Sequence, residues 1–319
     1  MVRFGSPNGS AVAAVILGVA LSAVSASLRL HARERQPLQK KNVEIGQPQP
    51  VSPELEGYDK DGKPMYWDPK PRVVPLGDGK YALKWFGHKG RELTLIYQRP
   101  DAIDSVVEAS AIQVSGTEIG YTYTIPNLRT SKQNLGGFVV QTFSSAARPR
   151  GEPGIYATDM ARFVKEFQHG RWVAFGLLTY PKRIDPGQQI VVVLDSPDLP
   201  GLLECRVHGG DATMKGVGEE PPTALEDLYL RHDAWPHGYT IGPDERISKM
   251  PAKARMQYLT QHLPQMLELG WIEDKPTMQW YKDKLQAGKV VEVRARAQRD
   301  FAKNLITSEV VGLITYLTR

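Results

Sequence analysis

The residues with the most chemical potential are concentrated between positions 226 and 239. Acidic, basic, histidine and aromatic side chains alternate there: Glu226, Asp227, Tyr229, Arg231, His232, Asp233, Trp235, His237 and Tyr239. Histidine together with carboxylate can bind zinc or act as an acid and base. His232 and His237 are five residues apart across Pro236, which breaks any single helical face, and no His-Glu-x-x-His or Cys-x-x-Cys motif accompanies them. We therefore predict no metal and no cofactor, and interpret the stretch as a surface loop.

The aromatic side chains of this stretch permit a second interpretation, as a binding platform. Tyr229, Trp235 and Tyr239 could stack on a sugar or a peptide while the charges orient it, with Trp172 as a further platform residue. Alternatively these rings plug the space between domains, which we favour. The candidate ligand-binding residues are Trp172, Tyr229, His232, Trp235, His237 and Tyr239.

Signals for catalysis are absent elsewhere in the chain. His208 and Asp211 flank Gly209-Gly210, but the end of a strand followed by a turn explains the same residues. There is no Gly-x-Ser-x-Gly elbow, no Walker loop and no dinucleotide fingerprint. The single cysteine, Cys205, lies between Leu203 and Val207 and is predicted to be a buried strand thiol. We predict a protein that is not an enzyme.

These side chains must be positioned by strands in the middle of the chain. Tyr121 to Ile125 alternates large apolar side chains with threonine, which is typical of a half-buried strand, and Pro126-Asn127 ends it. A second strand returns at 137–143, and we interpret the two as the paired centre of an antiparallel sandwich. The candidate strands are 81–86, 91–97, 105–114, 118–125, 137–143, 171–178, 188–194 and 203–208. Separated by Gly and Pro turns, they predict a mainly β fold, an antiparallel Ig-like β-sandwich over 81–210.

A small α-helical domain is predicted at 251–319, after an irregular connector at 211–250. Apolar residues recur at helical spacing from Met256 to Leu267, with Pro264 expected to kink this helix. Further helices are predicted at 276–286, 290–305 and 309–317, the last capped by Thr307 or Ser308.

The amino terminus carries the longest apolar run of the chain, residues 11–28. Arg3 precedes it and Val24-Ser25-Ala26 offers a cleavage point, which is typical of a secretory signal, although the length also suits a membrane anchor. The basic residues that follow, from Arg29 onward, oppose export. We predict a signal peptide or anchor at 1–30, an extended Pro-rich linker at 31–80, and an extracytoplasmic location.

Charge and composition restrict the partners. The chain has 40 basic and 35 acidic residues, a net charge of +5 that we interpret as widely spread. Because no patch combines basic and aromatic residues, we predict no nucleic-acid binding, and membrane contact only through the N-terminal segment. Envelope proteins or glycans are the expected partners.

Short motifs in both halves resemble exported bacterial proteins. Tyr121-x-Tyr123-x-Ile125, Ser131-x-Gln133 and Phe138-x-Val140 resemble the central hairpin of secreted bacterial β-sandwich proteins of uncharacterised function; the turns at Pro186-Gly187 and Pro200-Gly201 resemble their closing strands. Leu269-Gly-Trp-Ile272, Lys284-Leu285, Ala302-x-Asn304-Leu305, Ile306-Thr-Ser-Glu309 and Tyr316-Leu317 resemble a shortened FIMAH domain, a helical module of such proteins. The resemblance implies an exported, non-catalytic envelope or extracellular protein with a structural or protein-interaction role. A glycan-binding module and a hydrolase with an unrecognised site remain the alternatives.

Overall fold

The computed structural model describes residues 37–40, 46–48, 55–58, 60–62, 64–66, 71–87, 91–150, 156–159, 171–177, 184–210, 222, 225 and 235–319. The predicted signal peptide or anchor lies outside these residues, as do the candidates Tyr229 and His232. Within the described part, no helix is both long and apolar enough to cross a membrane.

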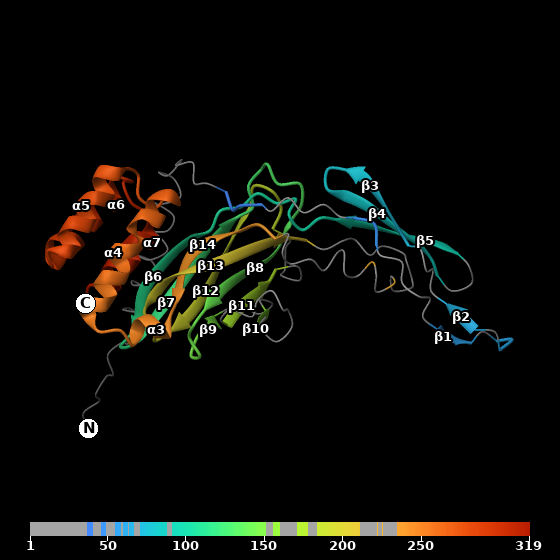
Figure 1. The fold of residues 1–319 in the computed structure, drawn as a ribbon, viewed down its shortest axis with the longest axis horizontal. Coiled ribbons are helices and arrows are strands. Elements are labelled where there is room, and N and C mark those ends of the chain that lie inside the picture. The colour runs from blue at the N-terminus through green and yellow to red at the C-terminus, as the bar shows by residue number, and fades with distance from the viewer. Residues whose placement is uncertain are drawn as a thin grey trace, which may run out of the picture. The chain divides into compact units, whose positions relative to one another are not determined.

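Two antiparallel sheets form the sandwich (Figure 1). The four-stranded sheet has the order β6 (Glu108–Ser115), β7 (Glu118–Pro126), β12 (Gln189–Ser196) and β9 (Arg148–Arg150). The five-stranded sheet has the order β10 (Tyr156–Asp159), β11 (Arg171–Gly176), β8 (Leu135–Thr142), β13 (Pro200–Gly209) and β14 (His237–Pro243). The layers β6-β7-β12 and β8-β13-β14 have the chain order of the A-B-E and C-F-G strands of an immunoglobulin domain. The predicted Ig-like fold class is therefore confirmed.

The two strands that we expected to pair, β7 and β8, are each central, but they lie in opposite sheets. β7 pairs with β6 and β12, whereas β8 pairs with β11 and β13, so the predicted hairpin is corrected. The side chains meet across the core instead: the rings of Tyr123 and Phe138 lie 5.2 Å apart. The buried Asn127 holds the loop between the strands, donating from Nδ2 to the carbonyls of Ile184 (2.8 Å) and Gln133 (3.0 Å).

The sandwich begins at β6, later than predicted. Three earlier strands, β3 (Arg72–Gly77), β4 (Lys80–Phe86) and β5 (Glu92–Gln98), form a separate antiparallel sheet with its own buried cluster around Trp85. The turn at Asp78 and Gly79 has positive φ values of 50° and 72°, the conformation that an Asp-Gly hairpin turn requires. A pair of short strands, β1 (Leu55–Tyr58) and β2 (Pro64–Tyr66), also lies in the range predicted as a linker.

The C-terminal part is helical, with boundaries close to those predicted. The helices are α3 (Glu245–Ser248), α4 (Ala252–Glu268), α5 (Lys275–Gln286), α6 (Val290–Ala302) and α7 (Ser308–Leu317). α4 continues as one helix through Pro264, and Thr307 is the N-cap of α7 without a side-chain capping bond. Neither β14 nor the four-residue α3 was predicted. For β14 the reason is that His237–Pro243 contains two glycines and no clear alternation.

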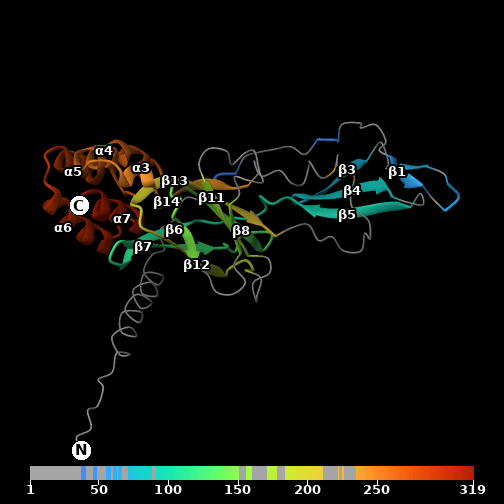
Figure 2. The ribbon, with the colours of Figure 1, turned by 90° about the horizontal axis from the view of Figure 1, so that it is seen from below.

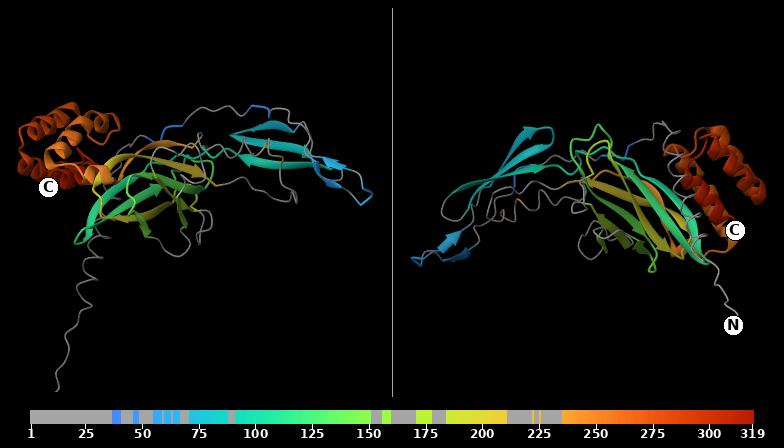
Figure 3. Two further views of the ribbon diagram at one scale, coloured as in Figure 1. Left: turned by 60° about the horizontal axis from the view of Figure 1, so that its bottom comes forward. Right: turned by 180° about the vertical axis from the view of Figure 1, so that it is seen from behind.

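The sandwich and the helices share one hydrophobic core. α7 lies next to β6 and β14 (Figure 2), and a Cβ on Gly312 would sit 3.2 Å from Ile241 Cδ1 and 3.5 Å from Ala111 Cβ. The backbone N–H of Leu202 donates to Tyr258 Oη over 3.0 Å, which ties α4 to β13. The orange-to-red helices form a single cluster in both views of Figure 3. The helical module is therefore built onto the sandwich rather than linked to it by a free tether.

Replacing Glu309 by alanine should lower the free energy of unfolding by about 2 kcal/mol. Glu309 is fully buried, and its Oε1 accepts a hydrogen bond of 2.6 Å from the backbone N–H of Ala109 on the edge strand β6. Glu309→Gln keeps an acceptor and should cost less, while Glu268→Ala, on the exposed end of α4, is the matched control. Urea unfolding measures all three. Equal losses for Glu309→Ala and Glu268→Ala would contradict a structural role for this carboxylate.

Candidate functional site

The described aromatic candidates belong to the outer face of the five-stranded sheet. Phe138 and Val140 point into the core, so Val139 between them points outward. Val139 forms a separate small cluster with Trp172 of β11 and with Trp235, just before β14. The fold thus brings together two of the predicted residues that are 63 positions apart in sequence, Trp172 and Trp235.

Both tryptophans are buried by their surroundings. The ring of Trp235 stacks on the ring of His208 with 4.2 Å between centroids, and the guanidinium of Arg206 lies 5.7 Å from the ring centroid of Trp172. Trp235 is 9% exposed and Trp172 2% exposed. A buried ring cannot present a face to a sugar, so these contacts pack the sheet surface. We had favoured a position for these rings between the sandwich and the helices. Trp172 and Trp235 lie instead on the outer face of the sheet, outside the core that the sandwich and the helices share.

His237 and Tyr239 lie on β14, at the edge of the sheet. The backbone of His237 exchanges two hydrogen bonds with Gln39, of 2.8 and 2.9 Å, so that residues 38–40 cover this edge. Tyr239 is 37% exposed and is the one described candidate aromatic that solvent reaches widely. Of the predicted site, the described residues therefore expose little aromatic surface.

Within the described ranges, the side chains with chemical potential are histidines, carboxylates and the single cysteine. Among the residues that the structure describes, no three His, Cys, Asp or Glu side chains come close enough to hold a metal ion. Cys205 is fully buried in β13, as predicted, and burial raises the pKa of its thiol. The thiol consequently stays protonated at neutral pH and is not a nucleophile.

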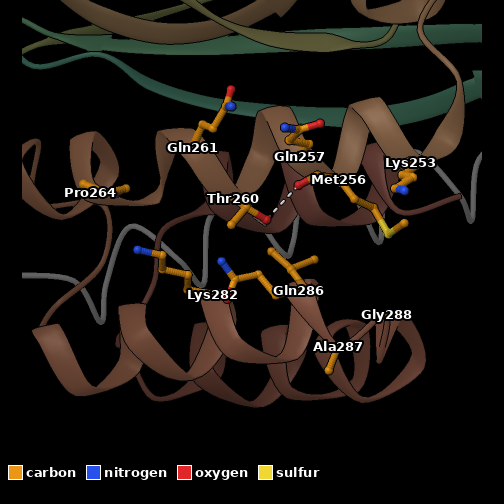
Figure 4. Close-up of a pocket in the computed structure, with 11 residues that line it drawn as sticks. Lys253, Met256, Gln257, Thr260, Gln261, Pro264, Lys282, Gln286, Ala287 and Gly288 are labelled. Atoms are coloured by element: carbon orange, nitrogen blue, oxygen red, sulfur yellow. Dashed lines mark hydrogen bonds between the residues drawn. The ribbon is translucent and has the colours of Figure 1, made fainter.

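A different surface is hollowed, the groove between α4 and α5 (Figure 4). Its volume is about 990 Å³. It is lined by Lys253, Met256, Gln257, Thr260, Gln261 and Pro264 from α4, and by Lys282, Leu285, Gln286, Ala287 and Gly288 from α5 and the turn after it. In Figure 4, Lys282 and Gln286 point toward α4, and Met256 points toward α5. We refer to this hollow, defined by these lining residues, as the α4–α5 groove.

The lining of the groove combines apolar and polar side chains. Met256, Pro264 and Leu285 supply apolar surface, and the lining contains lysine and glutamine but no carboxylate. Because Pro264 has no N–H, the carbonyl of Thr260 lacks its usual i+4 helical donor. The Thr260 hydroxyl is occupied, since it donates to the Met256 carbonyl over 2.8 Å. Such a surface can bind a partner by apolar contact combined with charge, without reacting with it.

Sequence reasoning missed this groove although one signal was present. The α4 residues that line it, from Lys253 to Pro264, recur in the i, i+3, i+4, i+7 pattern, which places them on one helical stripe. That stripe is mixed apolar and polar rather than core-like. The sequence does not show that this stripe faces the C-terminal end of α5.

Comparisons with known proteins identify no family. No family model and no curated protein matches the chain. Among solved structures, an uncharacterised protein from Nocardia farcinica, described as having an immunoglobulin-like fold, is 16% identical, with a TM-score of 0.24. The match covers 41% of this chain and 95% of that one. A likeness at this level bears on neither the site nor the function of the present chain.

Proposed function

We propose that the chain is an exported bacterial protein of the cell envelope or extracellular space, with a non-catalytic, protein-interaction role. The observation that carries the interaction role is the α4–α5 groove, mounted on helices that share a core with the sandwich. A rigid support keeps a binding surface in shape and lowers the entropy lost on binding. Export is supported by the apolar run at 11–28 and by the order of a sandwich followed by a FIMAH-like helical module.

Glycan binding ranks second. Among the candidates that the structure describes, its platform would rest on Tyr239, because the rings of Trp172 and Trp235 are covered. A single exposed ring provides little stacking area, whereas the groove provides about 990 Å³. The size of the available surfaces thus favours a protein partner.

Fractionation of bacteria that produce the full chain tests export. Antibody should detect the protein in the envelope fraction or the medium, and added protease should degrade it in cells whose outer layers are opened. A variant lacking residues 11–28 should stay in the cytoplasm, because it has lost the apolar run. A full chain with an intact amino terminus that is found only in the cytoplasm would end the proposal of export.

A further inference from the structure

The positive charge of the protein is concentrated in the helical module. Residues 245–319 contain thirteen Lys and Arg against eight Asp and Glu, a net charge of +5 that equals the net charge of the whole chain. Two of those acids, Asp300 and Glu309, are buried, which makes the module's surface still more positive. The net positive charge is therefore concentrated in one module, whereas composition alone had suggested that it was widely spread.

Within the module, the α4–α5 groove carries positive charge that no described residue neutralises. Lys253 and Lys282 line it and form no ion pair with any residue that the structure describes, whereas the nearby Lys249 and Lys284 are paired with Glu245 and Glu292. An unpaired ammonium in the lining of a groove favours a carboxylate on the molecule that enters the groove.

The start of α4 adds to this charge. Its N-cap is Pro251, which offers no side-chain capping bond, and its first turn has no acidic residue. By contrast, Asp274 caps α5 by accepting from the N–H of Thr277 at 2.7 Å. The first N–H groups of α4 thus have no side-chain acceptor, and the positive end of the helix dipole lies at the same end of the groove as Lys253.

The shape and the apolar lining of the groove indicate the length and the apolar face of the segment that would bind there. From Lys253 to Pro264 the groove follows α4 for about 16 Å, at the helical rise per residue, which is roughly three turns of a docked helix. Met256, Pro264 and Leu285 provide contact for apolar side chains, and the amides of Gln257 and Gln261 can bond to a polar flank. A helix that fits has one apolar face edged by Asp or Glu.

We propose that the α4–α5 groove binds an acidic amphipathic helix of a partner protein; this identification rests on the proposed interaction role and makes its partner class specific. Nucleic acid fits less well, because the lining has two lysines and no aromatic ring on which a base could stack. An anionic membrane fits less well too, since bilayers receive protruding apolar faces and this surface is concave.

The test uses the purified full chain and a displayed library of random 12-residue peptides. Enriched peptides are synthesised with a fluorescein label, and their affinity is measured by anisotropy. We expect enrichment of Asp and Glu next to apolar residues spaced three and four apart. The double variant Lys253→Glu/Lys282→Glu should weaken binding at least tenfold, because two attractive charges become repulsive. The control Lys275→Glu/Lys303→Glu changes the net charge equally at exposed sites outside the lining, and should change affinity less than twofold.

Several results would overturn the proposal. These are the absence of any enriched peptide, enrichment without acidic residues, or equal weakening by the groove and control variants. Binding of 12-nucleotide single-stranded DNA or of phosphatidylglycerol vesicles, lost in the groove variant and stronger than that of the peptides, would assign the groove to another class of partner. Because the assay needs no cell, its failure leaves export to be decided by fractionation, and a cytoplasmic location would leave the groove measurement intact.

Discussion

Replacing Gly136 by alanine should lower the free energy of unfolding by at least about 3 kcal/mol, a large part of the stability of a typical domain. Gly136 lies in β8, the middle strand of the five-stranded sheet. The backbone of Gly209 and Gly210 passes close to it. A Cβ on Gly136 would stand 2.3 Å from the carbonyl oxygen of Gly209 and 2.9 Å from the Cα of Gly210. Backbone atoms cannot rotate away, so the contact can be relieved only by separating β8 from β13.

The next residue, Gly137, provides the matched comparison. A Cβ there would lie 2.2 Å from His208 Nε2, which is a side-chain atom. His208 is held by its stacking on Trp235 and by a 2.8 Å contact of Nδ1 with the Gly209 carbonyl, so Gly137→Ala alone should cost about 1–3 kcal/mol.

Adding His208→Ala to each glycine variant distinguishes the causes of the two stability losses. It should remove the cost at Gly137, so that the double variant is no less stable than His208→Ala alone, but it should not rescue Gly136→Ala. Urea unfolding monitored by circular dichroism measures each variant. Rescue of both glycine variants by His208→Ala would show that the backbone approach at Gly136 is not the constraint.

These glycines show what the sequence could and could not predict. Alternation and turn residues gave the strands near their observed bounds, as for β7, because both signals are local. Which strands pair is not a local property, and β7 and β8 were assigned to one hairpin although they belong to opposite sheets. Their separation involves long-range contacts, such as the hydrogen bond that Asn127 donates to the distant Ile184 carbonyl.

The candidate site was harder to predict than the fold for the same reason. Trp172 and Trp235 were chosen as aromatic residues that could be exposed, but exposure depends on neighbours such as His208 and Arg206, brought by another strand. The burial of Cys205 was predicted because its own apolar neighbours at alternate positions indicate it. A groove requires two elements to face each other, and no single stretch of sequence contains that information.

The stability of the protein should fall steeply above about pH 10. Burial raises the pKa of the phenols of Tyr121, Tyr123 and Tyr281, and for Tyr281 the hydrogen bond to Asp300 raises it further. In the unfolded chain each phenol ionises near pH 10. Above that pH the folded state holds more protons than the unfolded state, so the free energy of unfolding decreases as pH rises. Each phenol contributes ~1.4 kcal/mol per pH unit, and the three together about 4 kcal/mol per unit.

Two phenylalanine variants test this slope and should differ at neutral pH. The Tyr123 hydroxyl is buried and has no hydrogen-bond partner in the described part of the chain, so Tyr123→Phe should be as stable as wild type at pH 7, or more stable by up to about 1 kcal/mol. The Tyr121 hydroxyl donates to the Asp198 carbonyl over 2.5 Å, so Tyr121→Phe should lose about 1 kcal/mol at pH 7. Above pH 10, the decrease in the free energy of unfolding per pH unit should be smaller in both variants by the contribution of one phenol, ~1.4 kcal/mol. Urea midpoints measured from pH 7 to pH 11.5 give both quantities, and an alkaline slope unchanged from wild type in both variants would mean that these phenols ionise in the folded protein as they do in water.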